Sequence, residues 1–182
     1  SAGDQRLTSD SATSADPSLA WTGGNLGVAW EDNRDGRFEI YFARTDSSGN
    51  KIGADLRLTN ATGDSEAPSL VWTGTEYGIT WYDSTPGNFE TYYARLDSVG
   101  NPVPGGEVRL SNASGFSEWP NIAWTGEHFG VVWSDARGGE YEVFFATVKC
   151  CGNDQDADTF GACDDCDDLE PAANPGETEV CD

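Results

Sequence analysis

The sequence predicts an all-β protein built from β-propeller blades, and three observations predict it. Its landmarks recur at a fixed offset of 51 and then 52 residues, which indicates one supersecondary unit copied in tandem. Each unit holds short runs of β-branched and aromatic residues bounded by Gly, Asn, Asp and Ser, and residues 1–149 show no helical periodicity. The recurring landmarks include Trp21-Thr22-Gly23, Trp72-Thr73-Gly74 and Trp124-Thr125-Gly126.

The elements of the first unit follow from its turn residues. A compact apolar strand ends at Thr-Gly-Gly-Asn, a second ends at Asp-Asn-Arg-Asp-Gly, and a third ends at Asp-Ser-Ser-Gly-Asn. The fourth carries the Arg-Leu-Thr motif that also opens the chain. We therefore expect strands at 17–21, 26–30, 38–44 and 56–59. Four short antiparallel strands in about 50 residues are typical of a propeller blade.

These repeats resemble a known family. The runs Pro-Ser-Leu-Ala-Trp-Thr-Gly from Pro17, Gly-Val-Ala-Trp-Glu-Asp-Asn-Arg-Asp-Gly from Gly27 and Ile-Tyr-Phe-Ala-Arg-Thr-Asp-Ser-Ser-Gly-Asn from Ile40 are similar to blades of sialidase-like, six-bladed propellers of bacterial extracellular proteins. The resemblance implies three four-stranded blades over residues 1–149, and it is specific for architecture rather than for activity.

Three blades are too few to close a ring, because propellers have four to eight. The segment 6–8 opens the chain with an Arg-Leu-Thr strand, whereas the third unit ends near Val148 without one. One hypothesis is a homodimer in which two chains form a six-bladed ring and each N-terminal strand completes the partner's last blade. The same exchange in an open arrangement predicts a filament. A third possibility is a processed part of a longer precursor with further blades.

The recurring Trp residues are best interpreted as packing between blades, because every blade needs the same filler. Trp119 and Phe116 do not recur, and they are the candidate ligand-binding aromatics. Asp32, Asp83 and Asp135 each follow the second Trp of a unit, and we expect them to accept backbone N–H groups in a turn. The arginine two residues later recurs in the first and third units, but Thr85 interrupts the series.

The sequence offers no unique pair of nucleophile and base, only repeated polar residues, and this argues against catalysis, since an active site breaks symmetry. The sequence analysis therefore predicts no catalytic residue and a non-enzymatic binding or assembly module that recognises a glycan or a protein. Two alternatives remain: a sialidase-like glycosidase remnant, and a surface fibre subunit assembled by strand exchange. An enzyme should lose its repeat symmetry at an acidic cleft with a cluster of arginines, whereas a binding or assembly module should not.

The charge of the chain is −22 and very uneven. Residues 150–182 hold eleven acids and no Lys or Arg, which predicts a domain boundary near Val148. This charge argues against nucleic acid as a partner, and no apolar run is long enough for insertion into a membrane. All five Cys lie in the acidic segment, which favours an oxidising compartment and therefore a secreted or extracellular surface protein.

The acidic segment has the spacing of a calcium loop. Asp154, Asp156 and Asp158 stand at positions 1, 3 and 5, the carbonyl of Phe160 at position 7 and Asp165 at position 12. Position 6 lacks the usual Gly, and no helical pattern flanks the loop, so an EF-hand is not expected. Ca²⁺ is the predicted cofactor. The alternatives are a solvated acidic linker and a zinc site formed by the cysteines.

The run Asp165-Cys166-Asp167-Asp168, followed by Pro-Gly and a closing Cys181-Asp182, resembles the Asp- and Cys-rich metal-binding repeat of bacterial secreted proteins, which is similar to thrombospondin type 3 repeats. The resemblance implies further metal ligands at Asp164, Asp167 and Asp168. It also implies a disulfide between Cys166 and Cys181, and a second between Cys163 and either Cys150 or Cys151. Residues 150–182 are thus predicted to form a calcium- and disulfide-stabilised stalk.

Overall fold

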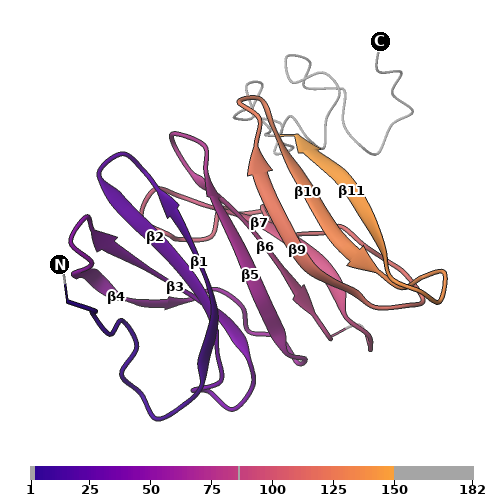
Figure 1. Cartoon of the computed structure of the whole chain (residues 1–182), viewed down its shortest axis with the longest axis horizontal. Coiled ribbons are helices and arrows are strands. Elements are labelled where there is room, and N and C mark those ends of the chain that lie inside the picture. Colours follow the sequence, from indigo (N-terminus) through magenta and orange to yellow (C-terminus); the bar gives the residue numbers. More distant parts are fainter. Residues whose placement is uncertain (1–2, 86, 150–182) are drawn as a thin grey trace.

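The computed structural model describes residues 3–85 and 87–149, which form antiparallel β-sheets (Figure 1). Within these ranges there is no helix, and hence no helix that could cross a membrane. The predicted metal ligands and cysteines all lie in residues 150–182, outside the described part of the chain. Calcium binding, the disulfides and the stalk therefore stay predictions.

Three sheets follow one another along the chain, and we call them blades 1, 2 and 3. Blade 1 consists of β1 (Ser14–Trp21), β2 (Asn25–Asp32), β3 (Glu39–Asp46) and β4 (Lys51–Arg57). Blade 2 consists of β5 (Ser65–Trp72), β6 (Tyr77–Asp83), β7 (Glu90–Leu96) and β8 (Val108–Arg109). Blade 3 consists of β9 (Ser117–Trp124), β10 (His128–Asp135) and β11 (Glu142–Lys149). The prediction of all-β, four-stranded antiparallel repeats is confirmed for the first two units.

Two strand predictions differ from the structure. The segment 6–8, expected to open the chain as a strand, forms none, and the fourth strands of the blades have other bounds. In blade 1 the fourth strand begins at Lys51 rather than Leu56, because the tight turn after Asp46 lets Lys51 pair directly with Thr45. In blade 2 the corresponding segment contains prolines, which cannot donate to a ladder, and β8 shrinks to two residues. The strand nevertheless pairs on the outer edge of its own unit, as the repeat pattern predicts.

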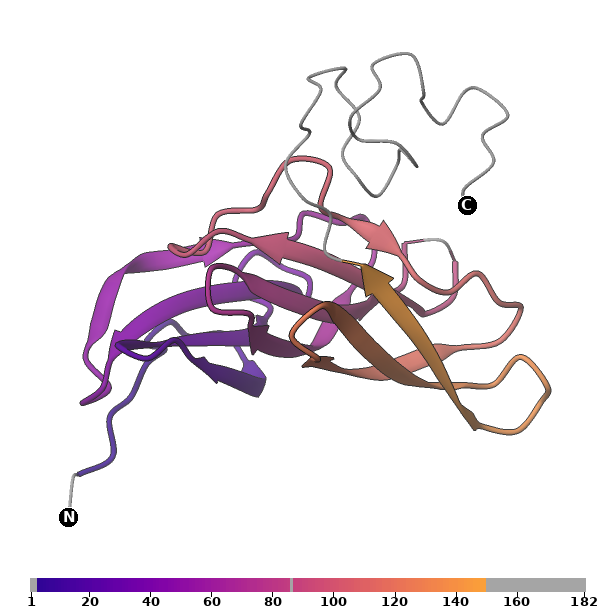
Figure 2. The same ribbon diagram turned by 90° about the horizontal axis from the view of Figure 1, so that it is seen from above.

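The first strands of the blades, β1, β5 and β9, lie side by side (Figure 1). Viewed from above, blades 1 and 3 lie on opposite sides of blade 2 (Figure 2). Side chains link these inner strands, since Ser18 Oγ accepts a hydrogen bond from Leu70 N at 3.0 Å. Ser69 Oγ repeats this contact with Ile122 N at 3.3 Å. The inner strands therefore converge as they do around a propeller axis.

An aromatic ring against a glycine forms the centre of each contact between blades. Tyr77 of blade 2 packs on Gly27 of blade 1, and Phe129 of blade 3 packs on Gly78 of blade 2. A Cβ at either glycine would stand 2.5 Å from a ring carbon, so only glycine lets the sheets approach this closely. Around these contacts lie two apolar clusters, one shared by blades 1 and 2 and the other by blades 2 and 3.

In each blade, a buried aspartate at the end of the second strand links that strand to the first strand. It accepts a hydrogen bond from the serine that opens the first strand, at 2.6–2.9 Å, in the pairs Ser14–Asp32, Ser65–Asp83 and Ser117–Asp135. Each aspartate also accepts the backbone N–H two residues later, as the turn interpretation predicts. In blades 1 and 3 the indole Nε1–H of the second Trp donates to the same carboxylate.

Candidate active site

The inner strands share an unusual backbone feature at one end. Asp16, Ala67 and Trp119 occupy equivalent positions and have positive φ angles of 45°, 49° and 52°. A non-glycine residue in this region is strained, and strain of this kind concentrates at functional sites. In β1 and β5 the strand pairing shifts at these points, which marks a β-bulge that redirects the neighbouring side chains.

Carboxylates from all three blades lie near these bulges. Glu66 and Glu118 come directly before the positive-φ residues of β5 and β9, and Asp16 is itself the positive-φ residue of β1. Glu31 lies on β2, and its carboxylate accepts a hydrogen bond from Ala67 N of the next blade at 2.9 Å. We call Asp16, Glu31, Glu66 and Glu118 the acidic cluster.

The carboxylates of the acidic cluster are close enough for the charge of one to shift the pKa of another. Burial raises the pKa of Glu31 above its ordinary value, the hydrogen bond from Ala67 opposes this, and the charges of Asp16 and Glu66 add to the increase. Burial also raises the pKa of Glu66, a hydrogen bond from Tyr82 lowers it, and nearby negative charges, including those of Glu118 and Asp16, raise it again. Two carboxyl groups of the cluster are therefore biased toward the protonated state.

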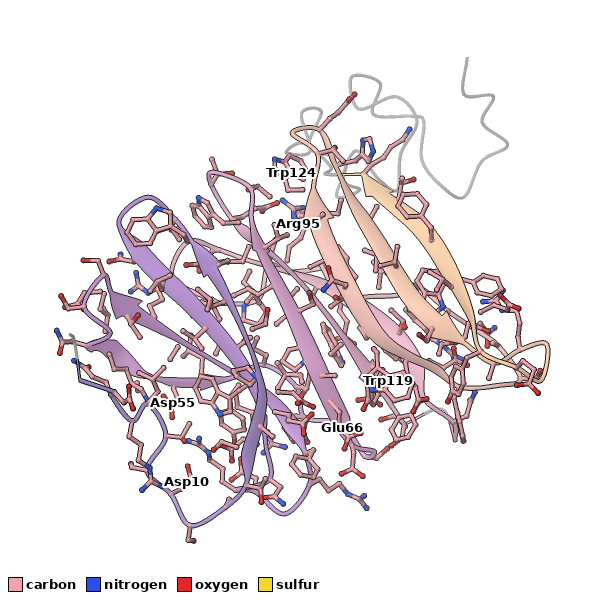
Figure 3. The ribbon with its side chains drawn as sticks, viewed as in Figure 1. Asp10, Asp55, Glu66, Arg95, Trp119 and Trp124 are labelled. Carbon is pink, nitrogen blue, oxygen red and sulfur yellow. The ribbon has the colours of Figure 1, made fainter. Side chains whose placement is uncertain are left out.

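The two aromatic residues singled out in the sequence stand beside this cluster. Trp119 is 55% exposed, and its ring lies 5.7 Å from that of Tyr141. The Tyr141 hydroxyl donates a hydrogen bond to Glu118. Phe116 is 48% exposed and contacts Phe89 edge-on at 5.8 Å. Figure 3 shows Glu66 and Trp119 at the same end of their strands, opposite Trp124 and Arg95.

Sequence reasoning missed the acidic cluster for an identifiable reason. Glu66 and Glu118 align with Ala15 of the first unit, so neither belongs to a motif present in all three units. Asp16 aligns with Ala67 and Trp119, and Glu31 with Tyr82 and Ser134. The sequence signal that could have found the cluster is that the residues at the start of the first strand differ between the three units. The arrangement is acidic, but across residues 3–85 and 87–149 no group of three or more His, Cys, Asp or Glu is placed to hold a metal ion.

Comparison with known proteins adds information about the fold. No protein-family model and no curated protein matches this sequence. Among solved structures, an exo-1,5-α-L-arabinanase from a bovine ruminal metagenomic library is similar, with a TM-score of 0.51, 15% identity and coverage of 85% of this chain and 57% of its own. The others include a Bacillus subtilis arabinanase (TM-score 0.48, 18% identity, covering 77% and 55%) and a GH43 endo-arabinanase from Bacillus licheniformis (0.46, 16%, covering 80% and 56%).

These arabinanases are five-bladed β-propellers, and this chain spans little more than half of their length. The propeller-like fold predicted from the repeats is therefore supported, whereas its sialidase-like character and the thrombospondin-like repeat are not. The expectation of a non-enzymatic binding or assembly module is corrected, because the similar solved structure with a TM-score of 0.51 is an exo-arabinanase, which is an enzyme. The acidic cluster departs from the repeat symmetry of the three units.

Proposed function

We propose that the acidic cluster is part of a glycoside-hydrolase active site and that Glu66 is its proton donor. Glycoside hydrolysis commonly uses two carboxyl groups, one protonated to assist departure of the leaving group and one ionised. The observation that carries the proposal is the raised pKa of Glu66 among carboxylates from three blades. A raised pKa keeps a carboxyl group protonated where it must act as an acid.

Asp16 is the ionised partner in this proposal. It is exposed at the bulge of β1, the inner strand beside the one that carries Glu66, and its charge raises the pKa of both Glu31 and Glu66. Asp64 and Glu118 supply further negative charge that disfavours ionisation of Glu66.

Trp119 is proposed to bind the sugar. An aromatic face packs against the C–H groups of a sugar ring, and Trp119 presents an exposed ring beside Glu118. Tyr141 contacts the Trp119 ring and donates a hydrogen bond to Glu118, so it fixes the position of both side chains. Phe116 extends the aromatic surface.

The test is whether the purified protein hydrolyses linear 1,5-α-L-arabinan and its oligosaccharides. These substrates are chosen because the similar solved structures are arabinanases. Removing a general acid costs about 10²–10⁴-fold in rate, so Glu66→Gln should lower kcat by at least about 100-fold while glycan binding persists. Glu127→Gln, an exposed turn substitution, is the matched control. Trp119→Ala should mainly raise KM.

Two results would overturn the proposal. One is a Glu66→Gln variant as active as the wild type and the Glu127→Gln control. The other is a wild-type chain that neither cleaves nor binds any arabinan fragment or other polysaccharide tested.

A further inference from the structure

The turn after β6 differs from its two counterparts at one functional position. In blade 1, Arg34 donates to Asp32 through Nε at 2.9 Å and through Nη2 at 2.6 Å. In blade 3, Arg137 makes the same pair of contacts with Asp135, at 2.8 and 2.7 Å. In blade 2 the equivalent residue is Thr85, whose exposed side chain cannot replace a guanidinium.

The surroundings of the missing arginine persist in blade 2. In blade 1 the guanidinium of Arg34 lies 4.4 Å from the centre of the Tyr41 ring, and its Nη1 forms an ion pair with Asp55 at 2.9 Å. Blade 2 has Tyr92 in place of Tyr41 and Glu107 in place of Asp55. Trp81 and Tyr92 stack at 5.9 Å, as Trp30 and Tyr41 do at 6.1 Å. The aromatic and acidic partners of the arginine are thus repeated without the arginine.

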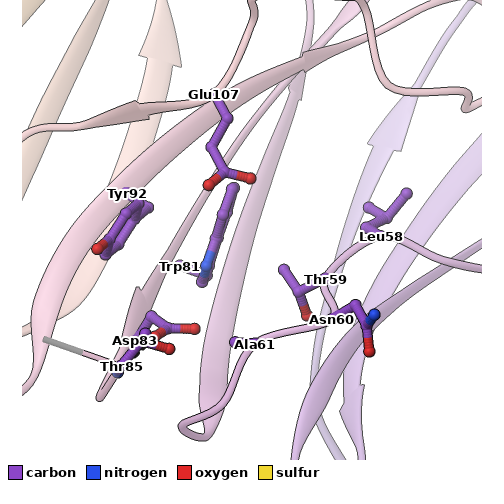
Figure 4. Close-up of a pocket in the computed structure, with 9 residues that line it drawn as sticks. All are labelled: Leu58, Thr59, Asn60, Ala61, Trp81, Asp83, Thr85, Tyr92 and Glu107. Atoms are coloured by element: carbon purple, nitrogen blue, oxygen red, sulfur yellow. Dashed lines mark hydrogen bonds between the residues drawn. The ribbon is translucent and has the colours of Figure 1, made fainter.

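A pocket of about 250 Å³ lies at this place, between blades 1 and 2. Its lining includes Trp81, Tyr92, Asp83, Thr85 and Glu107 (Figure 4). Asp83 is buried and accepts hydrogen bonds from Ser65 Oγ and Thr85 N, both at 2.6 Å. Glu107 is an exposed residue whose carboxylate lies beside Trp81 in the pocket lining (Figure 4). Partial burial of this carboxyl group, together with the charge of Asp83, raises its pKa.

We propose that this pocket binds the guanidinium group of an arginine from outside the described chain. A planar guanidinium stacks on aromatic rings and donates two parallel hydrogen bonds to a carboxylate, which matches the Tyr92 face and the two acids. Blade 1 demonstrates this mode of binding within the same molecule. The pocket has room for one side-chain head group, so the ligand class is an alkylguanidinium, either free arginine or an arginine residue of a polypeptide.

The experiment is an NMR titration of the full chain that follows the Trp81 indole Nε1–H resonance, assigned with Trp81→Phe. The probes are free arginine, N-acetyl-arginine methylamide, and the citrulline and lysine counterparts of the blocked amino acid. We expect a saturable shift with at least one arginine probe and none with citrulline, which has the same shape without the charge. Comparison of free and blocked arginine distinguishes a small molecule from a polypeptide as the source.

Two variants test the location of the site. Thr85→Arg should fill the pocket as Arg34 and Arg137 do, and abolish binding. Glu107→Gln should weaken binding about fivefold, and Glu127→Gln should not change it. Equal shifts with citrulline or lysine, unchanged binding to Glu107→Gln, or no saturable shift with either arginine probe would overturn the proposal. Thr85→Arg and Glu107→Gln change no residue of the acidic cluster. The proposals of hydrolysis and of guanidinium binding can therefore be refuted independently of each other.

Discussion

At the scale of single residues, the surroundings shift the pKa values of two carboxyl groups in opposite directions. Hydrogen bonds from Arg137 hold the pKa of Asp135 well below its ordinary value, and bonds from Trp133 and Ser117 contribute to the same effect. Glu66 experiences the reverse, because burial and neighbouring negative charge favour its protonated form. The first arrangement stabilises the fold, whereas the second lowers stability at the site proposed for catalysis.

Replacing Asp135 by Asn should destabilise the protein by about 2–3 kcal/mol at pH 7, the scale of hydrogen bonds to a charged group. Since the folded pKa is lowered, the ionised carboxylate stabilises the fold fully above the ordinary value of 3.8, and this contribution declines as the pH falls below that value. Urea unfolding of the wild type and the variant should therefore differ most near neutral pH and converge in acid. Asp4→Asn, at an exposed position, is the control, and a difference independent of pH would contradict the assignment.

Glu66→Gln should stabilise the fold slightly at pH 7, although it should lower the proposed hydrolytic activity. The folded pKa of Glu66 is raised, so the wild type loses stability as the pH rises from the ordinary value of 4.5 through the folded pKa. Glutamine has no proton to lose and avoids that loss. Thermal unfolding at pH 4 and pH 7 measures the effect, and a variant that is less stable than the wild type at pH 7 would indicate a structural role for Glu66.

At the scale of elements, the repeat specifies the strands and their contacts. The apolar runs predicted the positions of β1, β2 and β3, because their boundaries are set by local turn residues. The fourth strand was predicted too short in blade 1, since Lys51 and Ile52 pair through the geometry of the turn rather than through a hydrophobic pattern. Glycines within the second strands, such as Gly78, had no local explanation, because their partner Phe129 lies in the next blade.

Gly78→Ala should therefore destabilise the protein by about 1–3 kcal/mol, the usual cost of overpacking. The new Cβ would stand 2.5 Å from Cε1 of Phe129, inside the contact between blades 2 and 3. Gly138→Ala is the matched control, because a Cβ there meets no atom within 4 Å. Equal midpoints of urea unfolding for the two variants would contradict the proposed packing.

At the scale of the whole molecule, the two outer faces of the three-blade stack are apolar. Leu19 and Trp21 are exposed on blade 1, and Val132, Val143 and Phe145 on blade 3. Equivalent faces inside the stack are buried against the next blade. We propose that further blades cover these faces, including blades of a second copy, as in the ring or filament suggested by the repeats.

If copies associate through these faces, Phe145→Glu should lower the mass of the assembly in solution. Burial of a large apolar side chain contributes about 1.5–3 kcal/mol, so a charge at this position should weaken association between copies at least about tenfold. Sedimentation velocity over a range of concentrations should show an assembly for the wild type and for Ser47→Glu, a control in an exposed turn. A wild-type monomer at every concentration would exclude association between copies.

The whole-molecule arrangement also explains which parts of the site the sequence could show. The repeat was sufficient to predict blades, because each unit carries its own strands and turns. Trp119 and Phe116 were recognisable as residues that do not recur, but Asp16, Glu66 and Glu118 occur in three different units and are not all at equivalent positions. Only the convergence of β1, β5 and β9 brings them together, and this convergence depends on long-range packing.

We propose that the acidic cluster keeps Glu66 protonated as the donor for glycoside cleavage. The most direct measurement is an NMR titration of the Glu66 side-chain carboxyl carbon in the wild type and in Asp16→Asn, with Glu127 as an internal reference. We predict a pKa above 4.5 for Glu66 in the wild type and a lower value in Asp16→Asn, because the substitution removes a neighbouring negative charge. A Glu66 pKa at or below 4.5, or one unaffected by Asp16→Asn, would show that the acidic cluster does not hold the proton on Glu66.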